Sequence, residues 1–217
     1  MSCTQCKGIE KTFNRKTALK ELENYHIKGP RKSSKMLLDH LKREDINGLT
    51  LLDIGGGVGV IQHELLKSGV SSAINVDASP SYLSVSKEEA KKQGYANRIS
   101  YHQGNFIDLA PAIPPVNIVT LERVICCYPD LLALVASSSE KARNFYCLVY
   151  PRENILTKLG FAVVNFIQKV RRDNFRIFLH SRRDIHKVLY DNNFTTEYYR
   201  KTGFWQVEIF KKEASAA

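Results

Sequence analysis

The chain has 217 residues, of which 43% are hydrophobic and 25% are charged. These fractions are typical of a folded globular protein, and they exclude a disordered, collagen-like or coiled-coil chain. A chain of this length builds one core with a modest cap. The net charge of +10 attracts anions, so nucleic acid, an anionic membrane surface and an acidic small molecule are the partners to compare.

The amino terminus has no apolar segment of the kind that a secretory signal requires, because residues 1–6 run directly into charged sequence. The five cysteines are an odd number, and the neighbours Cys126 and Cys127 cannot easily pair with each other. We therefore expect reduced thiols and a cytoplasmic protein. Cys3 and Cys6 have the spacing of half a zinc site, but no second pair supports them, so we predict no metal.

Two helices are expected before the core. Apolar side chains recur at helical spacing over residues 9–41, and Gly29-Pro30 divides this stretch. The second helix is predicted to start at Ser33-Ser34 and to end at about Leu41. We assign residues 1–45 to an amino-terminal helical cap and residues 46–217 to the main domain.

From residue 49 onwards, short apolar runs alternate with helical stretches. The runs 51–54, 73–77, 99–102, 116–120 and 145–149 are predicted strands, and 60–67, 80–93 and 131–138 are predicted helices. Strands joined by helices indicate a mostly parallel sheet with helices on both faces. Runs 195–201 and 205–211 flank Thr202-Gly203 and predict a hairpin. The fold class is therefore a Rossmann-like α/β fold with seven strands, and the hairpin supplies an antiparallel strand.

A long apolar stretch, residues 155–170, follows the fifth strand and precedes a polar helix at 181–190. It is too short and too punctuated for a membrane span. We interpret residues 152–180 as a helical insertion that overhangs the carboxyl edge of the sheet and closes a pocket there. Arginines follow at positions 171, 172, 176, 182 and 183. An apolar wall beside positive charge suggests a lipophilic substrate with a carboxylate or phosphate; peripheral contact with an anionic membrane, or ordinary core packing, are the alternatives.

The glycine-rich loop Asp53-Ile54-Gly55-Gly56-Gly57-Val58-Gly59 stands between a predicted strand and a predicted helix. Glycines there permit a tight turn and let a ligand approach the backbone. A dinucleotide loop would need a small residue where Val60 stands, so that class fits poorly. Asp77, at the end of the next strand, can accept both hydroxyls of a ribose; the alternative is a helix cap before Pro80.

An acid two residues before Gly55, followed by Gly57 and Gly59, resembles the first motif of class I S-adenosylmethionine-dependent methyltransferases. The resemblance implies that Asp53 lies near the cationic aminoacyl end of the cofactor, where it either binds the ammonium directly or fixes the loop that does. It also implies that the loop after the third strand meets adenine and that the loop after the fourth strand lies beside the methyl donor. Where this family has an acid for adenine, the chain has Asn105, whose carbonyl oxygen can accept the same hydrogen bond. The cofactor residues implied are Asp53, Gly55, Gly56, Gly57, Gly59, Asp77, Ala78, Asn105, Phe106, Glu122 and Arg123.

The stretch Arg123–Asp130 and the later Tyr150-Pro151-Arg152 are similar to bacterial proteins grouped with magnesium-protoporphyrin methyltransferases, although lineage does not fix a substrate. Arg123 and Tyr128 are the first choices for substrate contacts. His26 and His180 are the candidate bases for removing a proton from the substrate. Each of these four residues also has a purely structural interpretation.

We therefore predict a methyltransferase that uses S-adenosylmethionine to O-methylate a small, lipophilic, anionic molecule. An RNA methyltransferase is the first alternative, favoured by the net charge. It lacks support because the usual N-P-P-Y tetrad is missing after the fourth strand and no aromatic-plus-basic RNA signature is present. The second alternative is a non-catalytic protein that binds the cofactor without turnover. The oligomeric state is left open.

Overall fold

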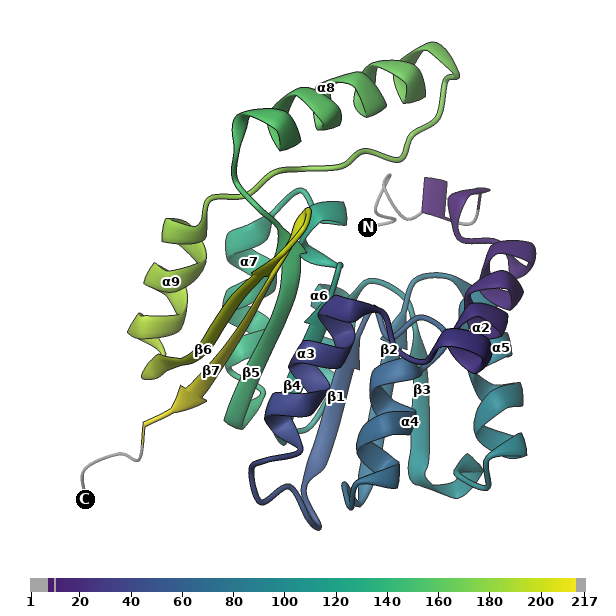
Figure 1. Ribbon diagram of the computed structural model, residues 1–217, viewed down its shortest axis with the longest axis vertical. Helices are drawn as coiled ribbons and strands as arrows, with labels where there is room; N and C mark the ends of the chain where they lie inside the picture. Colours follow the sequence, from purple (N-terminus) through teal and green to yellow (C-terminus); the bar gives the residue numbers. More distant parts are fainter. Residues whose placement is uncertain (1–7, 10, 214–217) are drawn as a thin grey trace.

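The computed structural model describes residues 8, 9 and 11–213 of the chain; Cys3 and Cys6 lie outside them. Seven strands form one sheet in the order β3-β2-β1-β4-β5-β7-β6 (Figure 1). The first five are parallel, and β7 runs antiparallel to both of its neighbours, as predicted. The strands are β1 (Thr50–Ile54), β2 (Ser72–Asp77), β3 (Ile99–Gln103), β4 (Val116–Glu122), β5 (Ala142–Pro151), β6 (Phe194–Thr202) and β7 (Trp205–Lys212).

Helices cover both faces of the sheet because side chains alternate along each strand. Leu51 packs with α3 and α4 on one face, whereas its neighbour Leu52 packs with α7 and α9 on the other. The helices are α2 (Arg15–Lys28), α3 (Lys32–Leu41), α4 (Val60–Lys67), α5 (Pro80–Lys92), α6 (Phe106–Leu109), α7 (Leu131–Ser139), α8 (Ile155–Val170) and α9 (Arg182–Asp191).

Local signals begin most of these helices where the sequence predicts. Ser79 caps α5 by accepting a hydrogen bond from the amide of Tyr82, and Asn154 caps α8 in the same way. Helix α3 differs. It begins at Lys32, and the predicted start signal Ser33-Ser34 is buried, with both hydroxyls bonded to side chains at the end of β4. These two serines thus join the cap to the sheet instead of capping a helix.

Helix α9 is held against the sheet by a buried carboxylate. Glu208 on β7 is fully buried and accepts hydrogen bonds from Tyr150 (2.8 Å), Arg182 (2.5 Å) and His186 (2.6 Å). Burial acts to raise the pKa of this carboxyl, but the hydrogen bonds from His186, Arg182 and Tyr150 outweigh it and lower the pKa below 4.5. The ionised form therefore stabilises the fold above about pH 4.5, and that contribution is lost as the pH falls through the lowered folded pKa.

Glu208→Gln is expected to lower the free energy of unfolding by about 2 kcal/mol at neutral pH. The amide keeps one acceptor but turns an NH₂ group toward buried donors. Urea unfolding measures the loss, and Glu197→Gln on the exposed neighbouring strand β6 is the matched control, with an expected change within about 0.5 kcal/mol. Equal effects of the two substitutions would contradict a structural role for the buried carboxylate.

Candidate functional site

A cavity of about 630 Å³ lies at the carboxyl ends of the central strands, under the amino-terminal helices. This is the edge at which open α/β sheets bind ligands. The glycine loop after β1, the ends of β2, β3 and β4 with their loops, the cap and Phe175 line it. Ten of the eleven predicted cofactor residues line the cavity; the exception is Gly59, which instead caps α4 with φ of +89°.

The glycine loop has a backbone that side chains would not allow. Gly55 has φ of +64°, and a Cβ there would lie 2.3 Å from Cγ2 of Val124. Farther along the loop, the amide of Gly57 donates a hydrogen bond to Oδ2 of Asp77 across 3.0 Å. The loop is therefore shaped by the chain that follows β4 and is tied to the end of β2.

Asp53 is buried at the end of β1, yet it lines the cavity. Its Oδ1 accepts a hydrogen bond from the hydroxyl of Thr120 at 2.7 Å, whereas Oδ2 is buried without a partner among the described residues. Burial raises the pKa of this carboxyl to about 7. A buried oxygen that lacks a partner is costly unless a ligand supplies one, so Asp53 fits the ammonium end of S-adenosylmethionine.

Asp77 lies at the end of the adjacent strand. Its two oxygens accept hydrogen bonds from the amides of Gly57 (3.0 Å) and Ser79 (2.8 Å). Burial raises its pKa to about 6 even though these amides favour the ionised form. The carboxylate is held rigidly at the cavity wall, where its remaining lone pairs suit ribose hydroxyls.

The loops after β3 and β4 meet at the other side of the cavity. The hydroxyl of Tyr128 donates a hydrogen bond to Oδ1 of Asn105 at 2.5 Å, and Phe106 beside it is buried against the cavity. The structure thus brings together a residue predicted for adenine and one predicted for substrate. Two loops that are distant in sequence share one wall.

Arg123 follows β4 in a left-handed backbone conformation, with φ of +61°. Its guanidinium donates to the hydroxyl of Ser33 at 3.0 Å and lies 4.5 Å from the ring centre of Trp205. Ser34 donates a hydrogen bond to Glu122 next to it. The residues that were expected beside the methyl donor therefore also fasten α3 over the cavity.

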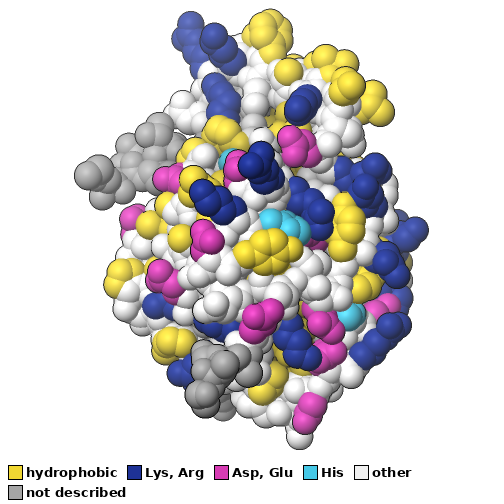
Figure 2. All heavy atoms as spheres, turned by 90° about the vertical axis from the view of Figure 1, so that its left-hand side faces the viewer, with side chains coloured by type: hydrophobic (Ala, Val, Ile, Leu, Met, Phe, Trp, Pro, Cys, Tyr) yellow, Lys and Arg dark blue, Asp and Glu magenta, His cyan; other side chains and the backbone are white. Residues whose placement is uncertain are grey.

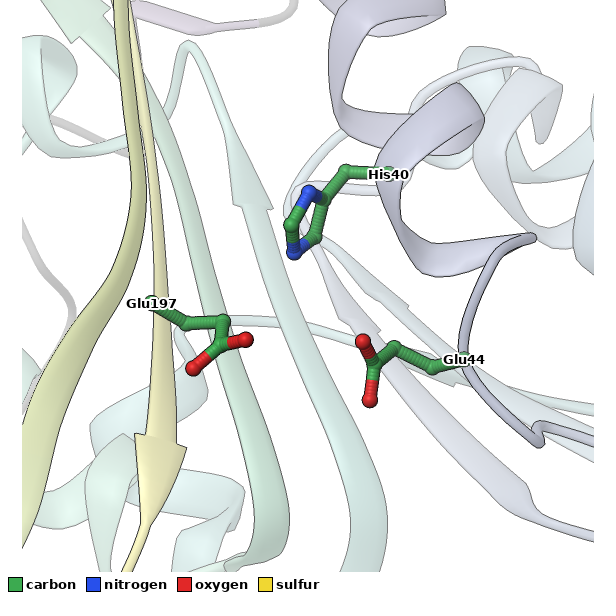
Figure 3. Close-up of side chains that lie close together, drawn as sticks. All are labelled: His40, Glu44 and Glu197. Atoms are coloured by element: carbon green, nitrogen blue, oxygen red, sulfur yellow. The ribbon is translucent and has the colours of Figure 1, made fainter.

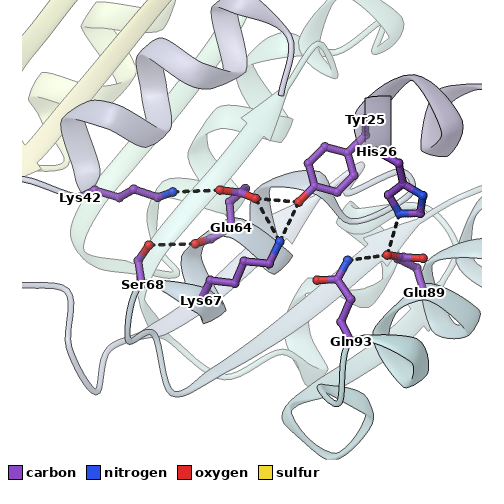
Figure 4. A network of polar contacts seen from close by, with 8 residues as sticks. All are labelled: Tyr25, His26, Lys42, Glu64, Lys67, Ser68, Glu89 and Gln93. Atoms are coloured by element: carbon purple, nitrogen blue, oxygen red, sulfur yellow. Dashed lines mark hydrogen bonds and ion pairs between the residues drawn. The ribbon is translucent and has the colours of Figure 1, made fainter. Parts of the chain in front are cut away.

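The two candidate bases lie elsewhere. His26 contacts Glu89 at 2.9 Å, in a network that joins α2 to α5 and also includes Gln93 (Figure 4). His180 lies 2.8 Å from the backbone oxygen of Tyr128. Neither histidine is among the described residues that line the cavity. In α2 the side chain of Tyr25 lines the cavity, whereas the next residue, His26, faces α5.

The cap supplies site residues that sequence reasoning missed. Glu21 and Arg31 line the cavity and pair with each other at 2.7 Å, and Phe13 packs against Phe175 with ring centres 5.6 Å apart. From the sequence alone, the basic stretch 28–35 is interpreted as a solvated surface. In the structure, Lys28, Arg31 and Lys32 are exposed and also line the cavity. The sequence signal that could have identified these cap residues is the charge cluster beside Gly29-Pro30, because this dipeptide marks a sharp turn between two helices.

The predicted insertion contributes less than expected. Only Phe175, which follows α8, lines the cavity; α8 itself does not, and neither do the five arginines at 171, 172, 176, 182 and 183. Arg182 pairs with Glu208 instead. The reason is that the inner face of α8 packs on the extended segment behind it, where Asn165 bonds both the amide and the carbonyl of Ile177.

A separate group of polar side chains lies between α3 and β6. Ligand atoms of His40, Glu44 and Glu197 come within 4.8 Å of one another (Figure 3). None of the three lines the cavity, and Lys211 lies 3.1 Å from Glu44, where it balances that carboxylate. The group therefore lies outside the candidate site.

A doubly wound sheet with a glycine loop after β1, and carboxylates at the ends of β1 and β2, defines a nucleoside-binding methyltransferase fold. Comparison with protein families agrees. Residues 46–175, more than half of the chain, match the family described as "Methyltransferase domain". The chain belongs to this family, and its cofactor is S-adenosylmethionine.

Among curated proteins, the chain is similar to the ribosomal protein L11 methyltransferase of Yersinia pseudotuberculosis, with 31% identity over 74 residues. This match covers 34% of the chain and a quarter of that relative's length. Because the match spans so little of that relative, the relative's substrate is not assigned to this chain.

Solved structures share the fold over most of the chain. Magnesium protoporphyrin IX methyltransferase (ChlM) from Synechocystis PCC 6803 with bound SAM has a TM-score of 0.67 at 16% identity, covering 96% of this chain and 97% of that one. An O-methyltransferase family 2 protein from Planctomyces limnophilus, in complex with apigenin, has a TM-score of 0.66 at 17% identity, covering 92% and 62%. At such identities the likeness shows a common fold.

Asp77→Asn is expected to weaken the binding of S-adenosylmethionine about tenfold. The substitution removes the charge and turns an NH₂ group toward a backbone amide that now donates to the carboxylate. Isothermal titration calorimetry measures the change. Asp108→Asn, on the exposed side of α6 and outside the cavity lining, is the control and should leave the affinity unchanged. Unaltered affinity in Asp77→Asn would remove this residue from the cofactor site.

Proposed function

We propose that this protein transfers a methyl group from S-adenosylmethionine to an oxygen of a small, lipophilic, anionic molecule. The observation that carries the proposal is the composition of the cavity beyond the glycine loop. There the cap adds aromatic walls, with the ring of Phe13 5.7 Å from that of Tyr82 and 5.6 Å from that of Phe175. Lys28 and Lys32 add positive charge to the same lining, where Arg31 is paired with Glu21.

This lining favours one class of substrate. Apolar rings bind a lipophilic body, while exposed cations beside them attract a carboxylate or phosphate without a large cost of desolvation. The cavity of about 630 Å³ lies in the middle of the range for small-molecule sites. A folded RNA would need contacts on an open surface, whereas these groups line a cavity beneath two helices.

Within this proposal, Asp53 receives the ammonium of the cofactor, Asp77 the ribose, and Asn105 with Phe106 the adenine. The cofactor supplies an activated methyl group, so the protein mainly orients the acceptor oxygen. We assign that task to Arg123 and Tyr128. Both line the cavity next to the cofactor residues. Arg123 is held by its hydrogen bond to Ser33, and Tyr128 by its hydrogen bond to Asn105.

The acceptor is proposed to be a carboxylate. A carboxylate is already ionised at neutral pH and needs no base, which accords with the absence of histidine from the described residues that line the cavity. A hydroxyl acceptor would require a proton acceptor. Of the lining carboxylates, Asp53 and Asp77 are assigned to the cofactor in this proposal, and Glu21 and Glu122 are engaged by Arg31 and Ser34. His26 and His180 take no part in this version of the reaction.

The test is to incubate the purified protein with labelled S-adenosylmethionine and a cell extract separated into small-molecule and RNA fractions. Label is expected in an apolar acid of the small-molecule fraction, and mild alkali should release it as methanol, as from a methyl ester. Label in RNA, with steeply salt-dependent RNA binding, would favour the nucleic-acid alternative. Cofactor binding without label in any fraction would favour the non-catalytic alternative.

A further inference from the structure

Helix α8 stands above the carboxyl edge of the sheet, apart from the layers that form the core (Figure 1). Eight of its large hydrophobic side chains are at least 40% exposed. The five most exposed, each more than 60% exposed, are Ile155, Leu156, Leu159, Phe166 and Val170. An exposed apolar surface of this extent on a globular protein marks an interaction site.

The exposed residues form one stripe along the helix. With 100° between successive residues, the five fall within an arc of about 100°. The opposite side faces the protein and is more polar: Thr157 is buried there, and Asn165 bonds Ile177. A core helix turns its apolar stripe inward, so α8 has the reverse orientation and its stripe has no partner among the described residues.

The charges on and beside this helix are mostly basic. Residues 155–172 include Lys158, Lys169, Arg171 and Arg172; the acidic residues Glu153 and Asp173 border this stretch, and Glu153 lies 4.0 Å from Lys158. On the helix, Lys158 and Lys169 lie along one edge of the apolar stripe, close enough for their stems to lie along an apolar surface while the ammonium groups stay outside it. Figure 2 shows hydrophobic side chains gathered at the top of the molecule, over α8, with Lys and Arg side chains beside them.

We propose that α8 docks onto the surface of an anionic lipid membrane, with its apolar stripe among the headgroups and Lys158 and Lys169 at the lipid phosphates. Amphipathic helices that lie in the membrane interface combine an apolar face with flanking basic residues in this way. The 16 residues of α8 extend for about 24 Å, which suits a helix lying flat. Among residues 8–9 and 11–213, no helix combines the length and apolar character that crossing a bilayer requires.

A second copy of the chain suits this face less well. A symmetric pair of α8 helices would bring the same four basic residues on each copy near one another, with only Glu153 and Asp173, at the two ends of this stretch, to balance them. Anionic lipid supplies the missing charge. The inference depends on α8 alone and holds whichever molecule is methylated.

Co-sedimentation of the full chain with lipid vesicles tests the proposal. Binding is expected to vesicles of phosphatidylcholine with about 30% phosphatidylglycerol, and to be about tenfold weaker with phosphatidylcholine alone. The triple substitution Leu156→Gln, Leu159→Gln and Phe166→Gln should lower binding to the anionic vesicles at least about tenfold. Lys158→Glu with Lys169→Glu should lower it similarly, and more so at low salt.

The matched control is Ile27→Gln with Leu132→Gln, which removes exposed apolar side chains (71% and 54% exposed) elsewhere on the surface. It should bind vesicles as the unaltered chain does. Circular dichroism and cofactor titration establish that every variant is folded. Equal binding of the triple variant and the control, or no binding of the folded chain to anionic vesicles, overturns the proposal. So does a concentration-dependent dimer that the triple variant dissociates, because a second copy then covers the face.

Discussion

Gly55→Val is expected to lower the affinity for S-adenosylmethionine by more than about a hundredfold. Gly55 has φ of +64°, which a β-branched residue adopts only with strain. A Cβ would also lie 2.3 Å from Cγ2 of Val124, so either the loop or the chain after β4 must move. Both border the cavity. Calorimetric titration of the cofactor measures the loss.

Gly94→Val is the control that separates the effect of backbone strain alone from damage to the cofactor site. Gly94 has φ of +78°, but a Cβ there meets nothing within 4 Å. This control should lose about 1–2 kcal/mol in free energy of unfolding and keep its cofactor affinity. Gly55→Ala, with the smaller side chain, provides a second variant if valine prevents folding. Normal affinity in a folded Gly55 variant would place the cofactor elsewhere.

The affinity for S-adenosylmethionine is expected to rise about fiftyfold between pH 5 and pH 7. Burial raises the pKa of Asp53 to about 7, so without ligand this carboxyl is largely protonated at pH 5. A cationic ligand group binds the ionised form and must displace the proton when the pH is low. The gain in affinity levels off near pH 7. At that pH Asp53 is already half ionised, and the α-amino group of the cofactor approaches its own pKa.

The linked effect on stability has the opposite sign. Folding raises the pKa of Asp53 from 3.8 to about 7, so between these values the folded chain holds more protons than the unfolded chain. The contribution of this group to the free energy of unfolding therefore falls as the pH rises through that range, and bound cofactor restores it. Thermal unfolding with and without cofactor, at several pH values, follows both effects.

Asp53→Asn is the control for this pH dependence. It removes the titrating group but keeps an oxygen that can accept the hydrogen bond from Thr120. Its affinity should be low and nearly flat between pH 5 and 7, apart from a smaller slope due to Asp77, whose pKa is about 6. A profile as steep as that of the unaltered chain would assign the pH dependence to another group.

The sequence by itself determined the order of strands and helices along the chain, the parallel sheet, and the position of two carboxylates, Asp53 and Asp77, at one edge of that sheet. The physical reason is that these depend on local patterns. Apolar periodicity marks each element, and the parallel arrangement brings the ends of successive strands to one edge, so Asp53 and Asp77 become neighbours without further information. The glycine loop is also local, because its conformation follows from the absence of side chains.

The tertiary structure alone decided what closes the cavity and which way α8 faces. Ser33 and Ser34 meet Arg123 and Glu122 across 90 and 88 residues of sequence, and no local pattern distinguishes such contacts from a helix start signal. Likewise, the sequence pattern of an apolar helix is the same whether its apolar stripe faces a core or the outside of the protein. Only the packing of its polar side on residues 173–178 turns the stripe of α8 outward, because a buried amide such as that of Asn165 must satisfy its hydrogen bonds within the protein.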